Sequence, residues 1–183
     1  MKYFFILKLN LQSMIRKILM LLNILLSVLI LITLDSCNHK TKNNDDQEFS
    51  DIQYFINNHP EINFELKPSG LYYNEVIKGH GLPAQTHDTA YAFFSLKFLN
   101  GTVLQSNFNT IDTLIFSVNE GIFIRGFDEA ITYMSEGGES LIIVPSSLGY
   151  GSAGRSDYIP GNTPLFFDIV LARIKRGPGP GRK

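Results

Sequence analysis

The sequence predicts an α+β fold, a twisted antiparallel sheet of about five strands wrapped on one short helix. Only one convincing helix falls among the strand-like segments, at about residues 126–134 (GFDEAITYM). Many strands with a single short helix favour a helix that covers one face of an antiparallel sheet. The predicted strands are rich in aromatic and β-branched residues and are bounded by Gly-containing turns; they span residues 71–78, 89–99, 113–118, 139–145 and 165–174.

Two further local signals complete this prediction. Asn100-Gly101 lies between two apolar segments and is typical of a tight hairpin turn. Upstream of the strands, residues 49–58 (FSDIQYFINN) carry apolar side chains at helical spacing, and Pro60 is a stop signal. We expect this short N-terminal helix to cover the domain, while a homodimer formed through residues 49–58 remains an alternative. The apolar positions are Phe49, Ile52, Phe55 and Ile56.

Composition and charge exclude one class of partner. The chain has 183 residues, of which 44% are hydrophobic and 18% charged, an ordinary globular composition. Much of the apolar content lies in the first 36 residues. Without residues 1–37, the remainder carries 12 basic and 16 acidic residues, a net charge of −4. Such a surface has no basic patch for phosphate backbones, so we expect no nucleic-acid partner.

The N-terminal segment has the pattern of a secretory signal. Arg16 and Lys17 precede an apolar run of about 17 residues, near the lower limit of a spanning helix. An uncleaved anchor and a plain secreted protein therefore remain alternatives. Leu34-Asp35-Ser36-Cys37 resembles a bacterial lipobox, although Asp35 departs from the usual small or uncharged residue. This resemblance implies lipidation of Cys37. Met14 is a candidate for the true start of the chain.

These segments predict a lipid-anchored protein of the bacterial cell envelope, on the periplasmic or surface face. The stretch after Cys37 is polar, and its apolar surface is too small to fold, which predicts a flexible tether. The predicted organisation is a signal peptide (1–36), lipidated cysteine and tether (37–48), helical extension (49–68), strand-rich domain (69–175) and disordered tail (176–183).

The sequence lacks the motifs of several common kinds of catalytic site. It contains no nucleophile elbow, phosphate-binding glycine loop, zinc-type Cys/His spacing or paired metal carboxylates. His80 and His87 are separated by GLPAQT, and exposed loop positions explain them better than a metal pair does. We therefore expect neither a metal nor a cofactor.

Four motifs between Ser69 and Ile174 carry a family resemblance. They are SGLYYNEVIKGHG, LNG, FIRGFDEAITYMSEGG and IIVPSSLGYGSAGRSDYIPGNTPLFFDIVLARI. In this order and spacing they resemble the FKBP-type peptidyl-prolyl cis-trans isomerases. The resemblance implies an enzyme that interconverts the cis and trans forms of X–Pro bonds, with proline-containing polypeptides as its clients.

The resemblance also assigns site residues. It implies that the Tyr150 hydroxyl and the Ile124 backbone N–H bind carbonyl groups of the substrate. Phe127 stands at the pocket floor, where the family usually has Trp. Gln105 replaces the usual Asp and Leu104 the usual Phe, which predicts reduced, not absent, activity. The further pocket residues are Phe94, Leu104, Gln105, Phe116, Phe123, Ile159 and Phe167.

Two functions remain open at this point. The first is a folding isomerase for exported proteins, favoured by Tyr150 and Ile124. The second is a low-activity chaperone or binding module in an envelope or motility assembly, favoured by Leu104 and Gln105. Pattern alone would assign most of the pocket phenylalanines to the sheet core. Tyr150 differs, because a tyrosine between two glycines in a turn has little packing reason to be there.

Overall fold

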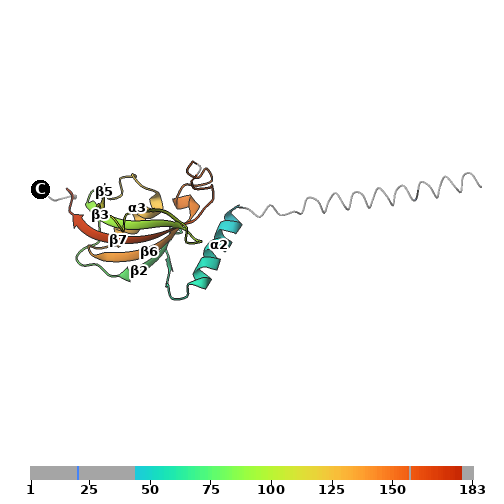
Figure 1. Cartoon of the computed structure of the whole chain (residues 1–183), viewed down its shortest axis with the longest axis horizontal. Helices are drawn as coiled ribbons and strands as arrows, with labels where there is room; N and C mark the ends of the chain where they lie inside the picture. Colours follow the sequence, from blue (N-terminus) through green and yellow to red (C-terminus); the bar gives the residue numbers. More distant parts are fainter. Residues whose placement is uncertain (1–19, 21–43, 157, 179–183) are drawn as a thin grey trace, which may run out of the picture. The chain divides into compact units, whose positions relative to one another are not determined.

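The structure is a computed structural model that describes residues 20, 44–156 and 158–178. Between residues 44 and 178 the sheet is accompanied by the α-helices α2 (Asn44–Asn58) and α3 (Arg125–Tyr133) and by a short 3₁₀ turn, η2 (Ser146–Leu148) (Figure 1). The strands in this part of the chain are β1 (Glu65–Leu66), β2 (Tyr72–Ile77), β3 (Thr89–Phe98), β4 (Val103–Ser106), β5 (Leu114–Ser117), β6 (Gly138–Val144) and β7 (Leu165–Lys175).

The sheet is antiparallel throughout. Its strand order is β1-β2-β6-β7-β3-β4, and β5 also pairs with β3. All five predicted strands are present, and the α+β prediction is confirmed. The predicted strand number was too low, because β1 and β4 are short and mostly exposed and so lack a clear alternation. The predicted turn joins β3 to β4, where Gly101 has φ +87° and donates its N–H to the Phe98 carbonyl (3.0 Å).

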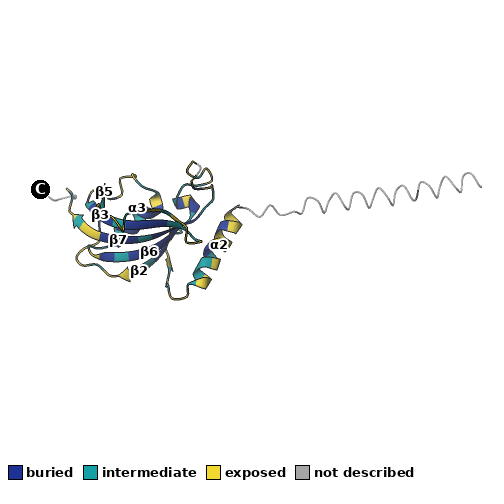
Figure 2. Ribbon diagram, viewed as in Figure 1, coloured by how far each residue is buried: buried dark blue, intermediate teal, exposed yellow. Residues whose placement is uncertain are grey.

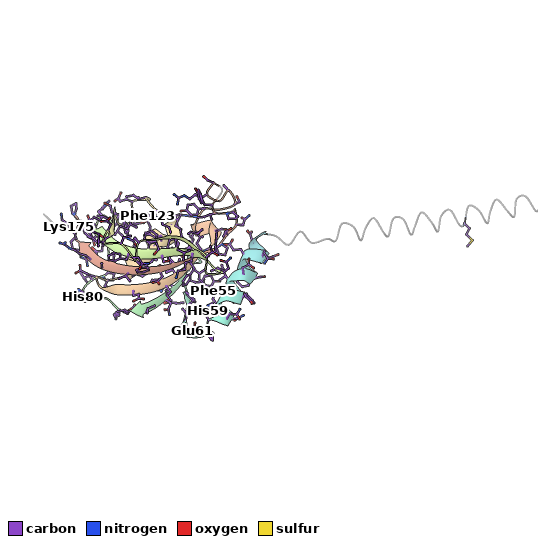
Figure 3. All side chains as sticks on the ribbon, in the orientation of Figure 1. Phe55, His59, Glu61, His80, Phe123 and Lys175 are labelled. Carbon is purple, nitrogen blue, oxygen red and sulfur yellow. The ribbon has the colours of Figure 1, made fainter. Side chains whose placement is uncertain are left out.

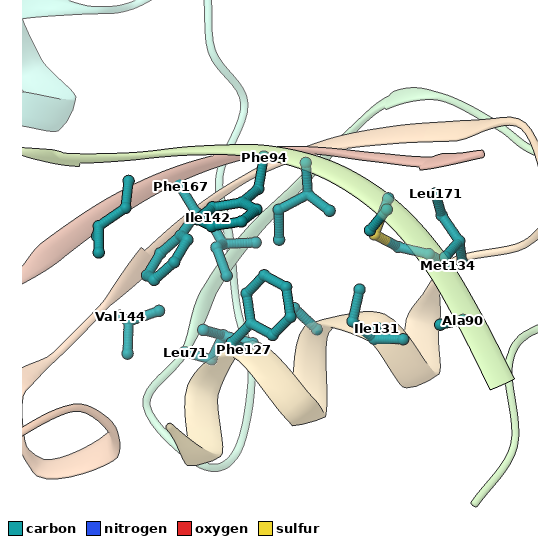
Figure 4. Packing of buried hydrophobic residues seen from close by; sticks show 14 of the residues in the cluster. Leu71, Ala90, Phe94, Phe127, Ile131, Met134, Ile142, Val144, Phe167 and Leu171 are labelled. Carbon is teal, nitrogen blue, oxygen red and sulfur yellow. The ribbon is translucent and has the colours of Figure 1, made fainter. Parts of the chain in front are cut away.

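The main core lies between α3 and one face of the sheet (Figure 4). Phe127 and Ile131, four residues apart on α3, point into this core and are at most 2% exposed. Gly126 allows the helix to approach the sheet closely, because a Cβ at this position would clash with the Val144 side chain. Facing them are sheet residues that are also buried, among them Phe94, Leu96, Ile142, Val144, Phe167, Ile169 and Leu171.

A second, smaller core lies on the opposite side of β6, where side chains of α2 pack against the sheet. Figure 2 shows α2 beside one end of the sheet, with much of its surface exposed. Ile52 is buried there, and the Phe55 ring lies 5.3 Å from the Phe166 ring, between centroids. The predicted helix therefore covers its own domain through Ile52, Phe55 and Ile56. One of the four predicted apolar positions was wrong. Phe49 is 58% exposed, because it lies off the face of α2 that contacts the sheet.

Helix α2 also begins earlier than predicted. It starts at Asn44, so residues 44–48 of the predicted tether are helical. Glu48 is buried, and its carboxylate accepts hydrogen bonds from the Ser146 N–H and from the Ser146 hydroxyl, the latter at 2.6 Å. Hydrogen bonds, and not the burial of apolar side chains, therefore hold this polar stretch of α2 against the domain. Such long-range bonds leave no trace in local composition.

The start of the predicted disordered tail is likewise fixed. Asp88 is 2% exposed and accepts hydrogen bonds from the Arg176 guanidinium (2.5 Å) and the Gly177 N–H (2.9 Å). Arg176 also donates to the Pro83 carbonyl (2.9 Å). The prediction was therefore wrong for Arg176 and Gly177, since both are bound to the loop before β3. Residues 179–183 lie outside the described residues.

The predicted signal peptide, Cys37 and the first part of the tether also lie outside the described residues. Within the part of the chain that the structure describes, no helix has the length and apolar character needed to cross a bilayer.

Candidate active site

A cavity of about 580 Å³ opens between the α3 side of the sheet, the first turn of α3 and two loops. The loops are residues 121–124, which lead into α3, and residues 149–155, which follow η2. The cavity brings together seven of the ten residues that the sequence assigned to the site. These are Phe94, Gln105, Phe123, Ile124, Phe127, Tyr150 and Phe167.

Phe127 is the centre of the aromatic part of this cavity (Figure 4). It is 2% exposed and lies in the first turn of α3. Four phenylalanine rings surround it at distances typical of aromatic pairs. They come from β3, β5, β7 and the loop before α3. Between centroids these distances are 5.2 Å to Phe123, 5.4 Å to Phe167, 5.7 Å to Phe116 and 6.1 Å to Phe94.

The other three predicted residues do not line the cavity. Phe116 is buried and packs against the rings of Phe123 (5.0 Å) and Phe127, so it supports the wall without forming it. Ile159 is buried in the core, and its carbonyl accepts the Arg155 N–H (2.8 Å). Leu104 is half-buried against the same core. All three belong to the main core or pack against it.

Six lining residues were not predicted. Leu96 follows Phe94 by two positions on β3, so strand alternation could have identified it. Arg155 lies in a Gly- and Ser-rich loop where no local pattern indicates its role. The full set is Leu96, Leu114, Ile122, Arg125, Gly149 and Arg155.

Tyr150 is positioned by its loop. The Gly151 N–H donates to the Ser146 carbonyl (2.8 Å), and the Gly154 N–H donates to the Tyr150 carbonyl (3.1 Å). The loop is tight enough that a Cβ on Gly161 would overlap the Ser152 carbonyl. These backbone contacts fix the loop from which the Tyr150 side chain reaches the cavity.

Among the residues that the structure describes, the Tyr150 hydroxyl has one hydrogen-bond partner. Arg155 donates to its oxygen at 3.0 Å, and the guanidinium carbon lies 5.5 Å from the ring centroid. Since this bond uses an acceptor site of the oxygen, the hydroxyl proton remains available to a second acceptor. Such a chain polarises the hydroxyl and strengthens it as a donor.

Ile124 presents a backbone donor at the cavity wall. It is the N-cap of α3, with φ −62° and ψ 145°, and its carbonyl accepts the N–H groups of Phe127 (3.0 Å) and Asp128 (3.1 Å). Its own N–H has no hydrogen-bond partner among the described residues. Asp128 steadies the preceding loop by accepting the Gly121 N–H (3.2 Å), and burial raises the pKa of this carboxyl.

The two histidines considered for a metal pair lie away from the cavity lining. His80, labelled in Figure 3, lies 3.6 Å from the Glu136 carboxylate, and His87 lies beside Glu120. Within the described residues, no group of three or more His, Cys, Asp or Glu side chains could hold a metal ion.

Residues 81–172, which contain the whole cavity lining, match the family model described as FKBP-type peptidyl-prolyl cis-trans isomerase. The chain belongs to this family. The FKBP-type relative FKBP2 of Mus musculus is 33% identical over 89 residues, which cover 49% of this chain and 64% of the mouse protein. The chain thus spans slightly less than two thirds of that relative's length.

Solved structures agree with this FKBP-type assignment. AtFKBP13 is similar with a TM-score of 0.57 and 30% identity, covering 62% of this chain and 99% of that one. FkpA from Escherichia coli has a TM-score of 0.65 and 24% identity, covering 85% and 72% respectively, and supports the fold alone. The family resemblance inferred from the four motifs is therefore confirmed.

Proposed function

We propose that this protein is a peptidyl-prolyl cis-trans isomerase that acts on proline-containing polypeptides. The observation that carries the proposal is the combination, in one cavity, of a phenylalanine floor with two donors, the Tyr150 hydroxyl and the Ile124 N–H. Rotation about an X–Pro bond has a barrier of about 18–20 kcal/mol and takes tens to hundreds of seconds without a catalyst. No covalent bond to the substrate needs to form or break.

The cavity suits this reaction for an electrostatic reason. A planar amide has more charge separation than a twisted one, so apolar surroundings that exclude water disfavour the planar ground state more than the transition state. Phe127 and its neighbouring rings supply these surroundings. The two donors would bind the carbonyl groups that flank the proline and hold the chain in the geometry that favours twisting.

The direct test is a protease-coupled assay on an Ala-Leu-Pro-Phe peptide. We expect the wild type to accelerate isomerisation and Tyr150→Phe to lower kcat/KM about tenfold, the effect of losing one hydrogen bond to the transition state. Tyr158→Phe is the matched control, because Tyr158 belongs to the same loop but is 78% exposed and outside the cavity lining. An equal loss in both variants would contradict the role of Tyr150.

A second expectation concerns Gln105, an exposed residue of β4 at the cavity. Gln105→Asp restores the acid that is usual in the family, and an ionised acceptor forms stronger hydrogen bonds than an amide does. We expect kcat/KM for the same peptide to rise about threefold, on the scale of one strengthened hydrogen bond. Gln105→Asn shortens the side chain equally without adding charge and is expected to leave the rate unchanged or lower. A threefold rise in both variants would contradict this account.

The alternative function is a low-activity FKBP-like chaperone or binding module. Gln105 and Leu104 favour it, because both depart from the usual family residues. Binding of an unfolded polypeptide together with no acceleration of the peptide reaction would favour this function over the isomerase.

We also propose that the protein is held at the bacterial cell envelope by a lipid on Cys37. The signal-like run and the lipobox resemblance support this, and both come from the sequence alone. Labelled palmitate is expected to enter the wild-type protein and to be absent from Cys37→Ser. Equal labelling of the two proteins in cells would contradict the anchor.

The apolar face of residues 49–58 packs against the sheet of the same chain. A homodimer through this helix would therefore have to form through its exposed side, where Phe49 and Tyr54 lie. Sedimentation of the wild type tests this association.

A further inference from the structure

A second concave surface lies near the cavity. We name it the hairpin groove; it has a volume of about 450 Å³ and runs between α2, the end of the β3–β4 hairpin and residues 160–164. Figure 3 labels Phe55 on the α2 side, and Figure 1 shows α2 beside this end of the sheet. The apolar side chains that line it are Tyr54, Phe55, Phe98, Leu99, Pro160 and Pro164.

The hairpin groove is a fixed feature of the fold, since its helical wall is fastened at several points. Glu48 in the first half of α2 is buried and hydrogen-bonded to Ser146, and Ile52 is 2% exposed. Phe55 packs on Phe166 of β7. Tyr54, in contrast, is 74% exposed, so an aromatic ring stands at the groove with most of its surface open to solvent. Large exposed aromatic residues in a concave apolar surface are typical of binding sites.

Two elements connect the hairpin groove to the isomerase cavity. On β3, Phe94 and Leu96 line the cavity and Phe98 lines the groove, and alternate positions of a strand share one face. Leu96 and Phe98 are about 7 Å apart along the strand, at about 3.3 Å per residue. The segment after η2 joins the two on the other side, with Tyr150 in the cavity and Pro160 in the groove.

We propose that the hairpin groove binds the client polypeptide itself, at apolar residues a few positions from the proline held in the cavity. This inference rests on the proposed function. An extended chain advances about 3.3 Å per residue, so two to four residues, as a rough estimate, would lead from the cavity to the groove. In Ala-Leu-Pro-Phe at most two residues flank the proline on one side, the shortest span of this range, whereas an unfolded protein chain covers all of it.

The test compares short and long substrates in the full chain. Tyr54→Ala is expected to lower kcat/KM about fivefold for an unfolded protein whose refolding is limited by proline isomerisation, the scale of losing one tyrosine contact that a bound client would cover. The same variant leaves kcat/KM for the Ala-Leu-Pro-Phe tetrapeptide unchanged. Phe49→Ala is the matched control, because Phe49 is an exposed aromatic residue of α2 outside the groove; it is expected to change neither rate.

Three outcomes would overturn the proposal. In the first two, Tyr54→Ala leaves the protein substrate unaffected, or it lowers both rates equally. In the third, Tyr54→Ala converts a wild-type dimer into a monomer in sedimentation, which would make a second copy the occupant.

If the wild type accelerates neither substrate, the proposed function fails separately. Fluorescence anisotropy with a labelled unfolded chain then decides the inference, since weaker binding by Tyr54→Ala than by Phe49→Ala supports the groove and equal binding overturns it.

Discussion

Phe127→Ala is expected to lower the free energy of unfolding by about 4 kcal/mol and to abolish most isomerase activity. The side chain is 2% exposed, and four other phenylalanine rings pack around it. Truncation removes both the contacts of these rings and the apolar floor that the proposed mechanism needs. Urea unfolding measures the first effect. The protease-coupled assay, at a temperature where the variant is folded, measures the second.

Ile131→Ala separates these two effects. Ile131 lies four residues further along the same face of α3, is fully buried, and does not line the cavity. We expect it to destabilise the domain by about 3 kcal/mol while leaving kcat/KM of the folded protein close to the wild-type value. If Phe127→Ala retains its activity while folded, or if Ile131→Ala loses as much, the cavity is not the site of the reaction.

Asp88→Asn is expected to cost about 3 kcal/mol at neutral pH, because it removes a buried carboxylate whose charge strengthens its hydrogen bonds and pairs it with the partly exposed Arg176. The Asp88 carboxylate accepts bonds from the N–H groups of Gln85 and Gly177 and from Arg176. Burial by itself would raise the pKa of Asp88. The two backbone N–H groups and the Arg176 guanidinium outweigh burial and lower this pKa below its ordinary value of 3.8. An asparagine cannot replace the charge or accept all of these bonds.

The lowered pKa fixes how this effect depends on pH. A carboxyl whose pKa is lower in the folded protein stabilises the fold fully above the unfolded value of 3.8, and this contribution is lost as the pH falls through the folded pKa. The stability difference between the wild type and Asp88→Asn should therefore be constant at neutral pH and shrink below about pH 4. Urea unfolding over this range tests it, with the exposed Asp112→Asn as control. A difference that grows on acidification would contradict the role of Asp88.

The sequence predicted the longer elements because each carries its own signal. The runs of aromatic and β-branched residues in β3 and β7 and the helical spacing of Phe127, Ala130 and Ile131 are local patterns that the tertiary structure did not override. β1 and β4 were missed because they comprise two and four residues and are mostly exposed. Pairing with a neighbouring strand, and not their own composition, makes them strands.

The two ends of the described domain were predicted less well, since distant partners determine them. Glu48 and Ser146 are 98 positions apart, and Asp88 and Arg176 are 88 apart. A single sequence read locally cannot reveal either pair. Each pair holds in the fold a polar stretch whose composition alone predicts mobility.

The site was predicted mainly through the family motifs. Tyr150, Ile124 and Phe127, which the resemblance assigned to the site, line one cavity, and their roles stay a prediction. Arg155 was missed although it donates to the Tyr150 hydroxyl, because its role depends on the path of a loop and not on a repeating pattern. Phe98 and Tyr54 in the hairpin groove were missed for a similar reason, since strand, helix and loop meet there only in the folded chain.

The central claim is that this cavity speeds rotation about X–Pro bonds and does not merely bind them. Exchange NMR on a proline peptide at equilibrium, without a coupling protease, tests it most directly. The account predicts that catalytic amounts of the protein increase the cis–trans exchange rate and leave the populations of the two forms unchanged, and that Phe127→Ala loses this effect while Ile131→Ala keeps it. Broadened or shifted signals that indicate binding, with an exchange rate equal to that of the free peptide, would contradict it.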